Sequence, residues 1–184
     1  MVGNQPTILL SGNTSSELAL DLYQKSSISY SKFFKMDILS RVAFLSAELL
    51  SPYEARDKES IATVISTASG CIEVDKKFEE SRQTLASPAL FVYTLPNIML
   101  GEICIRQGFK GEQICTIEAL ANYNMMHFQV TDLTQHRGTS ACLCGHVEAT
   151  EQGISVQMLW VSQEQETEMA LPFTLDNLQK IFTV

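Results

Sequence analysis

The chain has 184 residues, of which 45% are hydrophobic and 18% are charged, enough for one globular domain with a core of ordinary size. Lysine and arginine number 13 against 21 acidic residues, so the net charge of −8 leaves no basic face for a nucleic-acid backbone. No window approaches the roughly 20 apolar residues that span a bilayer, and residues 1–6 lack the basic and apolar regions of a secretory signal. We expect a single domain over residues 1–184, soluble and cytoplasmic, with no nucleic-acid partner and no membrane span.

The first part of the chain alternates apolar and polar segments. Residues 7–11 form a short apolar run before a Gly-Asn turn, which predicts a strand, and residues 25–32 are typical of a polar surface connection. From Asp37, which can cap a helix, apolar residues recur at helical spacing until Pro52 ends the pattern. Residues 61–66 are β-branched and almost continuously apolar, which predicts a strand buried on both faces between layers of helices.

The middle of the chain predicts two helices and a further strand. Residues 75–83 are charged and typical of an exposed helix, whereas an apolar helix opens with Pro96 in its first turn and ends at Gly108. Gly101 lies inside this second helix at a cost of about 1 kcal/mol relative to alanine, so we expect close packing against a neighbour there. Residues 113–118 then predict a strand.

The last third of the chain predicts a helix over residues 119–131, strands over 139–148 and 154–162, and a short helix over 175–182. The two strands are separated by a turn at Gly153, which indicates an antiparallel pair. The whole pattern predicts an α/β fold, with a mixed sheet, helices on both faces and a C-terminal antiparallel hairpin.

The cysteines form an odd set within apolar runs, namely Cys71, Cys104, Cys115, Cys142 and Cys144. This setting indicates small core residues in a reducing compartment. Cys142 and Cys144 are separated by one residue, which places them on one face of a strand and does not match the two-residue spacing of a zinc knuckle. We expect no metal site and no cofactor.

Three segments in the middle of the chain occur in a familiar order and spacing. Residues 87–103 read SPALFVYTLPNIMLGEI, a Gly-Phe-Lys-Gly segment follows at 108–111, and a later strand reads Leu-Cys-Gly-His-Val-Glu at 143–148. Together they resemble the β-ketoacyl synthases, the condensing enzymes of fatty acid and polyketide assembly, and the resemblance covers roughly residues 37–162. The motif residues that carry structure are Pro96, Asn97, Gly101, Gly111, Gly145 and Glu148.

The resemblance implies a thiolase-like half-fold. The family has two similar halves, of which this chain could hold only the N-terminal one. In that half a nucleophilic cysteine stands at the start of the helix after the strand at 113–118, and the spacing to Glu148 places that position at Leu120. The Cys-x-x-Gly signature is also missing, because Asn122 and Tyr123 stand where small residues are expected. Leucine offers no nucleophile.

The other catalytic groups of the family, two histidines (or a histidine and an asparagine) and a lysine, lie in the half that this chain lacks. None of the three histidines of this chain, His127, His136 and His146, matches the positions of these catalytic groups. We therefore expect no catalytic residue for ordinary condensation. Cys115 is the fallback nucleophile, although a mid-strand cysteine is more typical of core packing. His146 and Glu148 alternate onto one face of a strand, where they form either an acid-base pair or, as the family's glutamate does, a structural support for neighbouring backbone.

Two surfaces are candidates for contacts. An acyl channel or a dimer interface would involve the strand at 113–118, which in the family pairs across a two-fold axis, and the helix after it; the candidates are Cys115, Ile117, Leu120, Tyr123, Met125, Met126 and Phe128. An acidic segment at 163–168 would repel an acidic acyl carrier protein, so carrier docking would use cations elsewhere. These cations are Lys76, Lys77, Arg82, Arg106 and Lys110.

Three functions remain open on the sequence. The first is a catalytically impaired ketosynthase-like subunit, similar to a chain-length factor, that forms a homodimer or a heterodimer with a ketosynthase in fatty acid, polyketide or aryl-polyene assembly. The second is an acyltransferase or condensing subunit that uses Cys115 or is completed by a second chain, with an acyl carrier protein as partner. The third is a ligand-binding or interaction domain. We favour the first because Leu120 occupies the nucleophile position.

Overall fold

The computed structural model describes residues 12–50, 57–163 and 170–182. The strand expected at 7–11, the helix end at Pro52 and most of the acidic segment at 163–168 lie outside these residues. The helices are α1 (Ser15–Lys25), α2 (Ile38–Leu49), α3 (Ile72–Arg82), α4 (Pro88–Val92), α5 (Ile98–Gln107), α6 (Tyr123–His136) and α7 (Leu175–Phe182), with 3-10 turns at Phe33–Lys35 and Lys58–Ser60. The strands are β1 (Ile61–Thr67), β2 (Gln113–Ile117), β3 (Ala141–Thr150) and β4 (Gly153–Ser162).

The strands form one mixed sheet in the order β2-β1-β3-β4. β1 pairs in parallel with both β2 and β3, whereas β3 and β4 form the expected antiparallel hairpin. Every residue of β1 is buried, as its apolar, β-branched sequence predicts for a central strand. The α/β fold class and the C-terminal hairpin are therefore confirmed.

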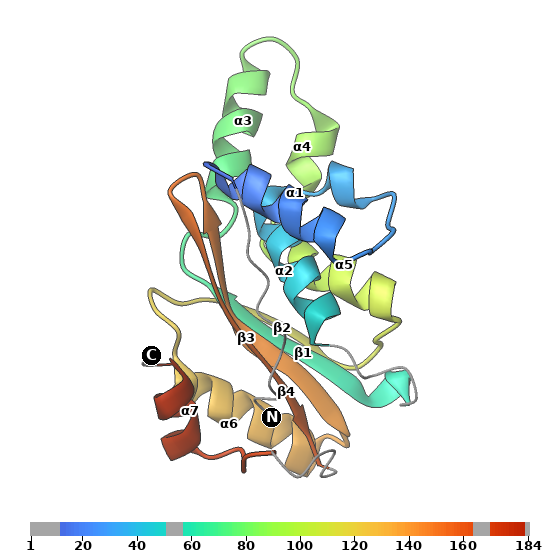
Figure 1. The fold of residues 1–184 in the computed structure, drawn as a ribbon, viewed down its shortest axis with the longest axis vertical. Coiled ribbons are helices and arrows are strands. Elements are labelled where there is room, and N and C mark those ends of the chain that lie inside the picture. Colours follow the sequence, from blue (N-terminus) through green and yellow to red (C-terminus); the bar gives the residue numbers. More distant parts are fainter. Residues whose placement is uncertain (1–11, 51–56, 164–169, 183–184) are drawn as a thin grey trace.

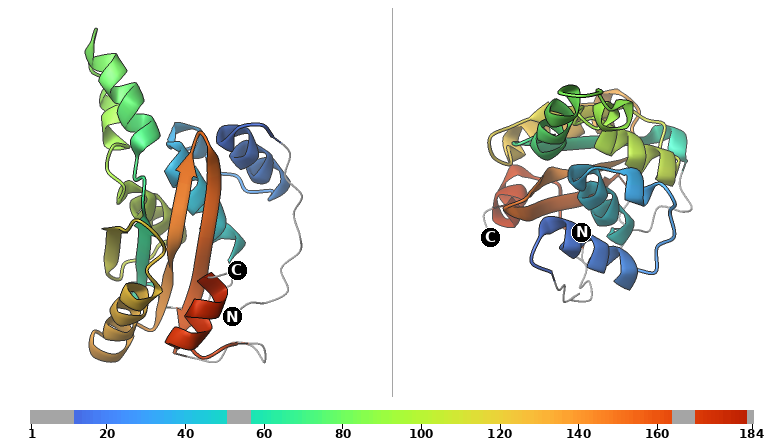
Figure 2. Two further views of the ribbon diagram at one scale, coloured as in Figure 1. Left: turned by 90° about the vertical axis from the view of Figure 1, so that its left-hand side faces the viewer. Right: turned by 90° about the horizontal axis from the view of Figure 1, so that it is seen from above.

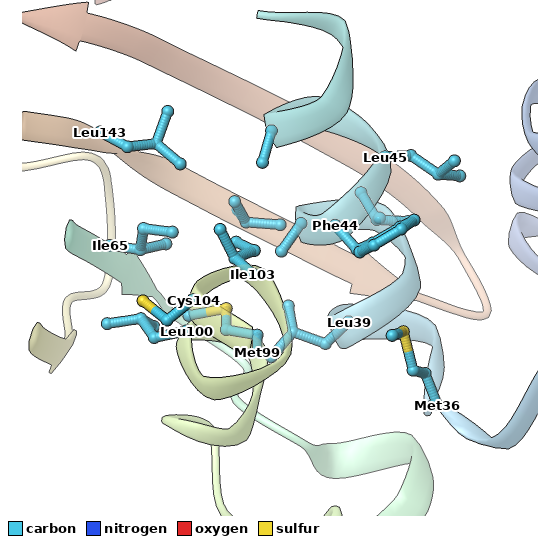
Figure 3. Packing of buried hydrophobic residues seen from close by; sticks show 14 of the residues in the cluster. Met36, Leu39, Phe44, Leu45, Ile65, Met99, Leu100, Ile103, Cys104 and Leu143 are labelled. Carbon is cyan, nitrogen blue, oxygen red and sulfur yellow. The ribbon is translucent and has the colours of Figure 1, made fainter. Parts of the chain in front are cut away.

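Helices cover both faces of the sheet (Figure 1). On one face α2 and α5 pack on the sheet, and their side chains, including Phe44 and Ile103, surround Ile65 and Leu143 (Figure 3). On the other face α6 and α7 cover a smaller cluster that includes Val64. Successive residues of β1 thus point into different cores, which is the alternation that a strand between two helical layers requires.

Short-range signals in the sequence fix several helix ends. The Asp37 carboxylate accepts hydrogen bonds from the backbone N–H groups of Leu39 and Ser40 at 3.1 and 3.2 Å, and so caps α2 as expected. Gly108 ends α5 with φ of 76°, in the left-handed region that glycine adopts without strain. Asn97, rather than Pro96, is the N-cap of α5, so the expected place of Pro96 in the first turn is wrong by two residues.

The structure corrects the sequence-based expectations about four helices. The helix expected at 119–131 is wrong at both ends, because residues 119–122 form a loop and α6 continues to His136. The Asn122 side chain accepts a hydrogen bond from the N–H of Met125 at 3.1 Å, and this cap sets the later start. Helices α1 and α4 were not expected, and α3 begins at Ile72, earlier than the charged segment indicated.

The motif glycines differ in what surrounds them. A Cβ atom at Gly145 would collide with the backbone of Gln157 in β4, and one at Gly111 would collide with the carbonyl of Ile61, so close backbone approach requires glycine at both positions. At Gly101 nothing lies within 4 Å of an added Cβ atom. The close packing expected around Gly101 is therefore wrong for this chain. None of the described helices is both long and apolar enough to cross a membrane.

Candidate functional site

Strand β2 forms an open edge of the sheet. At its two ends the Thr63 N–H donates to the Glu112 carbonyl at 2.9 Å and the Glu118 N–H donates to the Thr67 carbonyl at 3.0 Å. In a parallel pair, the N–H and C=O groups of one residue point to the same neighbouring strand, and those of the next residue point the other way. Because Glu112 and Glu118 bond to β1, the backbone groups of the even-numbered residues of β2 face β1. The N–H and C=O groups of Gln113, Cys115 and Ile117 therefore point to the open side.

The open edge carries none of the usual protection against pairing. Strand β2 reads Gln-Ile-Cys-Thr-Ile, with no charged residue and no proline. Soluble proteins usually place lysine, proline or a bulge on an edge strand, because unpaired N–H and C=O groups otherwise recruit another strand. An unprotected, uncharged edge is thus a surface suited to strand addition.

Exposed apolar side chains gather along the chain where β2 leads into α6. Leu120 is 81% exposed in the connecting loop, Ile117 is exposed at the end of the strand, and Met125 and Phe128 are exposed on α6. We call the outward backbone of β2 together with these four side chains the β2 edge surface. Scattered single hydrophobic residues are ordinary, but four of them between residues 117 and 128, at and after the end of an open strand, indicate a contact surface.

The remaining candidates from the sequence lie inside the fold. Met126 is buried with Val130 on the inner side of α6, and Tyr123 is half-buried against the same cluster. Cys115 is half-buried against the opposite core, and burial raises the pKa of its thiol. A raised pKa lowers the thiolate fraction at neutral pH, so this environment does not activate Cys115 as a nucleophile.

Leu120, the position that the sequence resemblance predicts for a nucleophile, lies in a loop. Leu120 precedes the first residue of α6, Tyr123, and the cap residue Asn122 stands between them. The positive end of a helix dipole acts mainly within the first turn, so a side chain at Leu120 lies outside the region where it would stabilise a thiolate.

A polar cluster lies where β1 ends and β3 continues past it. The Glu148 carboxylate accepts hydrogen bonds from the Thr67 hydroxyl at 2.7 Å, from the Ser69 N–H at 3.2 Å and from the Ala68 N–H. Burial raises the pKa of Glu148, but these hydrogen bonds outweigh it, and the pKa lies below its ordinary value. The charged carboxylate thus orders the backbone that leaves β1.

His146 lies beside this carboxylate and is buried. Its Nδ1 atom lies 2.8 Å from the Ser66 hydroxyl, and its Nε2 atom lies 3.8 Å from the Glu148 carboxylate. Burial lowers the pKa of His146, although the negative charges of Glu148 and Glu118 act in the opposite direction. The geometry suits a neutral imidazole between a hydroxyl and a carboxylate, buried too deeply to meet a substrate.

Sequence reasoning missed three members of this cluster, Ser66 and Thr67 of β1 and Ser69 just after it. A signal was present, because the apolar strand at 61–66 runs directly into Ser-Thr-Ala-Ser-Gly. Polar residues at the carboxyl end of a buried parallel strand are where α/β proteins place functional groups. The structure brings Thr67 and Ser69 to Glu148 and Ser66 to His146, which lie about eighty residues later in the chain.

The other polar candidates are paired or isolated. The His127 ring stacks on Phe173 at 5.3 Å, on the face opposite α5. Four of the five carrier-docking candidates lie beside carboxylates of their own chain, in the pairs Lys76–Glu73, Arg82–Glu79, Arg106–Glu48 and Lys110–Glu59. No group of three or more potential metal ligands occurs in the part of the chain that the structure describes.

A shallow depression of about 360 Å³ lies at the opposite ends of the strands from Leu120 and Glu148. It is lined by Glu59, Ser60, Lys110, Gly111, Glu112, Arg137, Gly138 and Thr139. Its two cations are neutralised locally, since Lys110 pairs with Glu59, and Arg137 pairs with Glu112 and Asp132. The β2 edge surface is therefore the stronger candidate for function.

The fold matches solved structures, although no protein-family model and no curated protein matches the sequence. "The ishigamide ketosynthase/chain length factor" is matched with a TM-score of 0.62 and 16% identity over 78% of this chain. A ketosynthase (ApeO) in complex with its chain length factor (ApeC) from Xenorhabdus doucetiae is matched with a TM-score of 0.60 and 15% identity over 85% of this chain. A type II acyl-carrier protein in complex with its ketosynthase is matched with a TM-score of 0.51 and 14% identity over 74%.

The chain covers different shares of the three matched structures. The chain spans 48% of the first of these structures and 46% of the third, but 73% of the matched chain of the second. The expected thiolase-like half-fold is confirmed, because the chain has the fold found in ketosynthase and chain-length-factor structures over most of its own length.

Proposed function

We propose that this chain is a single-domain, ketosynthase-like subunit that pairs with a second chain of the same fold and has no thiol catalysis of its own. The second chain is a ketosynthase, or another copy of this chain. The setting is acyl-chain assembly of the fatty acid, polyketide or aryl-polyene type, and the role is that of a chain-length factor. Comparable structures are named as ketosynthases with chain length factors, which supports this assignment.

One observation carries the proposal, namely the unprotected edge of β2 that ends beside Leu120. The outward N–H and C=O groups of Gln113, Cys115 and Ile117 offer a template for a partner strand, and none of the five residues of β2 is charged. Antiparallel addition of an identical or similar strand would satisfy these groups. The exposed side chain of Leu120 would then lie at the margin of the joint surface.

The environment of the two candidate nucleophile positions supports a non-catalytic role. Leu120 has no reactive group, and the raised pKa of the half-buried Cys115 thiol disfavours the thiolate that acyl transfer requires. Glu148 and His146 engage the end of β1 rather than an open space. The chain would therefore shape or stabilise a partner's site instead of forming an acyl-enzyme.

The edge can be tested by a single backbone change. Gln113→Pro removes one outward N–H, and proline is tolerated at the first residue of an edge strand, so the fold should survive. We expect the dissociation constant of the complex with a ketosynthase from the same organism, or of the homodimer, to rise at least about tenfold in sedimentation velocity. The matched control, Gln113→Thr, retains the N–H and should bind as the original chain does.

Two results would contradict the proposal. One is that Gln113→Pro and Gln113→Thr associate equally well. The other is that the chain remains monomeric both alone and with the ketosynthase. The catalytic alternative is tested separately, by incubating the chain with acyl carrier protein thioesters and measuring intact mass. An acyl adduct that disappears in Cys115→Ala would replace the non-catalytic proposal.

A further inference from the structure

Few side chains of helix α7 are buried against the body of the molecule. The helix lies at the same end of the sheet as α6, at the lower end in Figure 1 and in the left view of Figure 2. Helix α2 buries seven of its twelve residues, whereas α7 buries only Leu178 of its eight. A helix of eight residues has little stability of its own, so α7 depends on its packing against the rest of the fold.

The polar contacts of α7 add little to this packing. The Asn177 side chain donates a hydrogen bond of 2.9 Å to the Pro172 carbonyl, which belongs to the same C-terminal segment. Toward the sheet, the Gln157 side chain donates to the Phe182 carbonyl at 3.5 Å, which is long for a hydrogen bond. Undocking of α7 thus breaks little structure elsewhere, and segments of this kind open before the whole fold does.

Two cysteine thiols lie in the core beside α7. Cys142 and Cys144 are fully buried on one face of β3, in the cluster that also contains Leu178. The pairing of β3 with β4 places Val161 opposite Cys142 and Leu159 opposite Cys144. The two thiols therefore lie next to β4, the strand to which α7 is bonded.

Helix α7 closes the β4 side of these thiols. Helix α6 covers the cluster where it packs on β1 and β3, with Val130 buried there. On the other side Leu178 of α7 joins the same cluster, together with Leu159 of β4. When α7 leaves, the cluster opens to solvent at Leu159, directly beside Cys144.

The two thiols are protected while α7 is in place. A cysteine reacts with a disulfide through its thiolate and only where the reagent can reach the sulfur. Hydrogen bonding with Cys144 and burial raise the pKa of the Cys142 thiol, and neither cysteine is exposed to solvent. Opening of α7 reduces this burial and admits a reagent, so the reactivity of the pair depends on α7.

Cys142 and Cys144 cannot form a disulfide with each other while β3 is intact. Residues i and i+2 of a strand are about 6.6 Å apart, at about 3.3 Å per residue, whereas the Cβ atoms of a disulfide lie about 3.5–4.5 Å apart. A disulfide at either cysteine therefore joins it to a small-molecule thiol. The added group has no room in a packed core, so Leu178 cannot return over it.

From these observations we infer that α7 is a lid over Cys142 and Cys144, and that a mixed disulfide at either cysteine holds the lid open. The thiolate attacks one sulfur of a small-molecule disulfide, R–S–S–R. A protein–S–S–R bond forms, the R–S–S–R bond breaks, and the released R–S⁻ takes up the proton that the cysteine lost. Excess thiol reverses the exchange, so the lid is a redox-sensitive switch. It does not depend on the proposed pairing at β2.

The reaction rates of the cysteines test the lid in the unmodified chain. The folded chain is incubated with 2-hydroxyethyl disulfide at about pH 8, and modification of each cysteine is measured by peptide mass spectrometry. We expect Cys142 or Cys144 to react at least about tenfold faster than Cys104, which is buried in the opposite core. Equal rates would show that all three react through global unfolding and would overturn the lid. A folded chain in which neither Cys142 nor Cys144 reacts would overturn it as well.

Two leucine substitutions in α7 locate the opening. Leu178→Ala removes the buried side chain and should speed modification of Cys142 and Cys144 at least about tenfold, while Cys104 remains slow. The matched control is Leu175→Ala in the same helix, where the side chain is 40% exposed, and this variant should react as the original chain does. The lid is wrong if Leu178→Ala speeds all three cysteines alike or none of them.

Hydrogen exchange tests whether modification holds the lid open. In the mixed disulfide the amides of α7 should exchange as fast as those of an unfolded peptide, while those of β1 and α2 stay protected. Dithiothreitol should restore slow exchange in α7. If α7 stays protected after modification, the thiols were reached by another route and the switch is overturned. If β1 and α2 lose protection too, modification unfolds the chain and the switch is equally wrong.

Discussion

His146 and Glu148 are adjacent polar residues of one strand face, and the structure gives them a structural role. Each is fixed by a group from the end of β1, His146 by the Ser66 hydroxyl and Glu148 by the Thr67 hydroxyl and neighbouring N–H groups. His146 is buried, and the Glu148 carboxylate is taken up by donors at the end of β1. Their ionisation is therefore coupled to folding rather than to a reaction.

The lowered pKa values of His146 and Glu148 predict that the folded chain is less stable in acid. Below the ordinary histidine pKa of 6.5 the unfolded chain binds a proton at His146 more readily than the folded chain does, because burial disfavours the imidazolium. The free energy of unfolding should fall as the pH drops below 6.5. A second loss should begin near pH 4.5, where Glu148 starts to protonate in the unfolded chain and its hydrogen bonds favour the charged folded form. Urea denaturation measured from pH 7 to pH 4 would follow both losses.

A substitution at His146 separates the first loss from the second. His146→Gln keeps a polar side chain near Ser66 but cannot protonate, so the dependence between pH 7 and pH 5 should flatten while the loss near pH 4.5 remains. The control, His136→Gln, changes an exposed histidine at the end of α6 and leaves the contacts of His146 in place. An unchanged slope in His146→Gln would assign the acid sensitivity to other groups.

Two glycines of α5 and its C-cap differ in whether an alanine could replace them. Gly101 is in the helix interior with open space around it, whereas Gly108 ends the helix with φ of 76°. Gly101→Ala should raise the free energy of unfolding of the dilute monomer by about 0.5–1 kcal/mol, because alanine restricts the unfolded chain and favours helix. Gly108→Ala should lower it by about 1 kcal/mol or more, because an alanine there must adopt a strained left-handed conformation.

The pair of variants tests whether Gly101 has open space around it in solution. Urea midpoints measured at low protein concentration should move in opposite directions for the two alanines. If Gly101→Ala also destabilised the monomer, close packing would exist at Gly101 in solution. A variant that stabilises the monomer but weakens the complex would instead locate a partner contact at this helix face.

Elements with local signals could be predicted from the sequence. The β-branched run at 61–66 predicted the buried strand β1, and Asp37 and Gly108 marked a helix start and a helix end correctly. Helix α1 also had a local signal that was overlooked. Thr14 and Glu17 form a capping box, in which the Glu17 carboxylate accepts from the Thr14 N–H at 3.2 Å and the Glu17 N–H donates to the Thr14 hydroxyl.

Features that depend on distant residues could not be predicted in the same way. The start of α6 was placed too early because the apolar pattern around Leu120 resembles helix, while the Asn122 cap decides the boundary. The interface candidates share one segment of sequence, yet Met126 is buried and Leu120 is exposed, because only one side of α6 packs on the sheet. The contact of Glu148 with the end of β1 depends on the pairing of β1 with β3.

At the scale of the whole molecule, the sheet has two covered faces and two edge strands. Helices cover both faces, and β2 and β4 form the two edges. An association through the β2 edge surface would bury one of these edges together with the exposed apolar side chains at and after its end.

The composition of the β2 edge surface predicts an unusual response to salt. Strand β2 carries no charge and the four side chains of this surface are apolar, whereas the whole chain has a net charge of −8. Two copies therefore repel each other at long range but attract through backbone hydrogen bonds and apolar burial. Raising the ionic strength from about 0.1 to about 1 M shortens the Debye length from about 10 to about 3 Å and screens only the repulsion.

Self-association should consequently tighten, or at least persist, in high salt. Sedimentation equilibrium at the two ionic strengths would measure the dissociation constant directly, with Gln113→Pro as a control that should stay weakly associated in both. A dissociation constant that rises steeply with salt would show that ion pairs carry the contact, because charge attraction between exposed groups is what salt weakens. The interface would then lie at a charged surface, and its assignment to the β2 edge surface would be wrong.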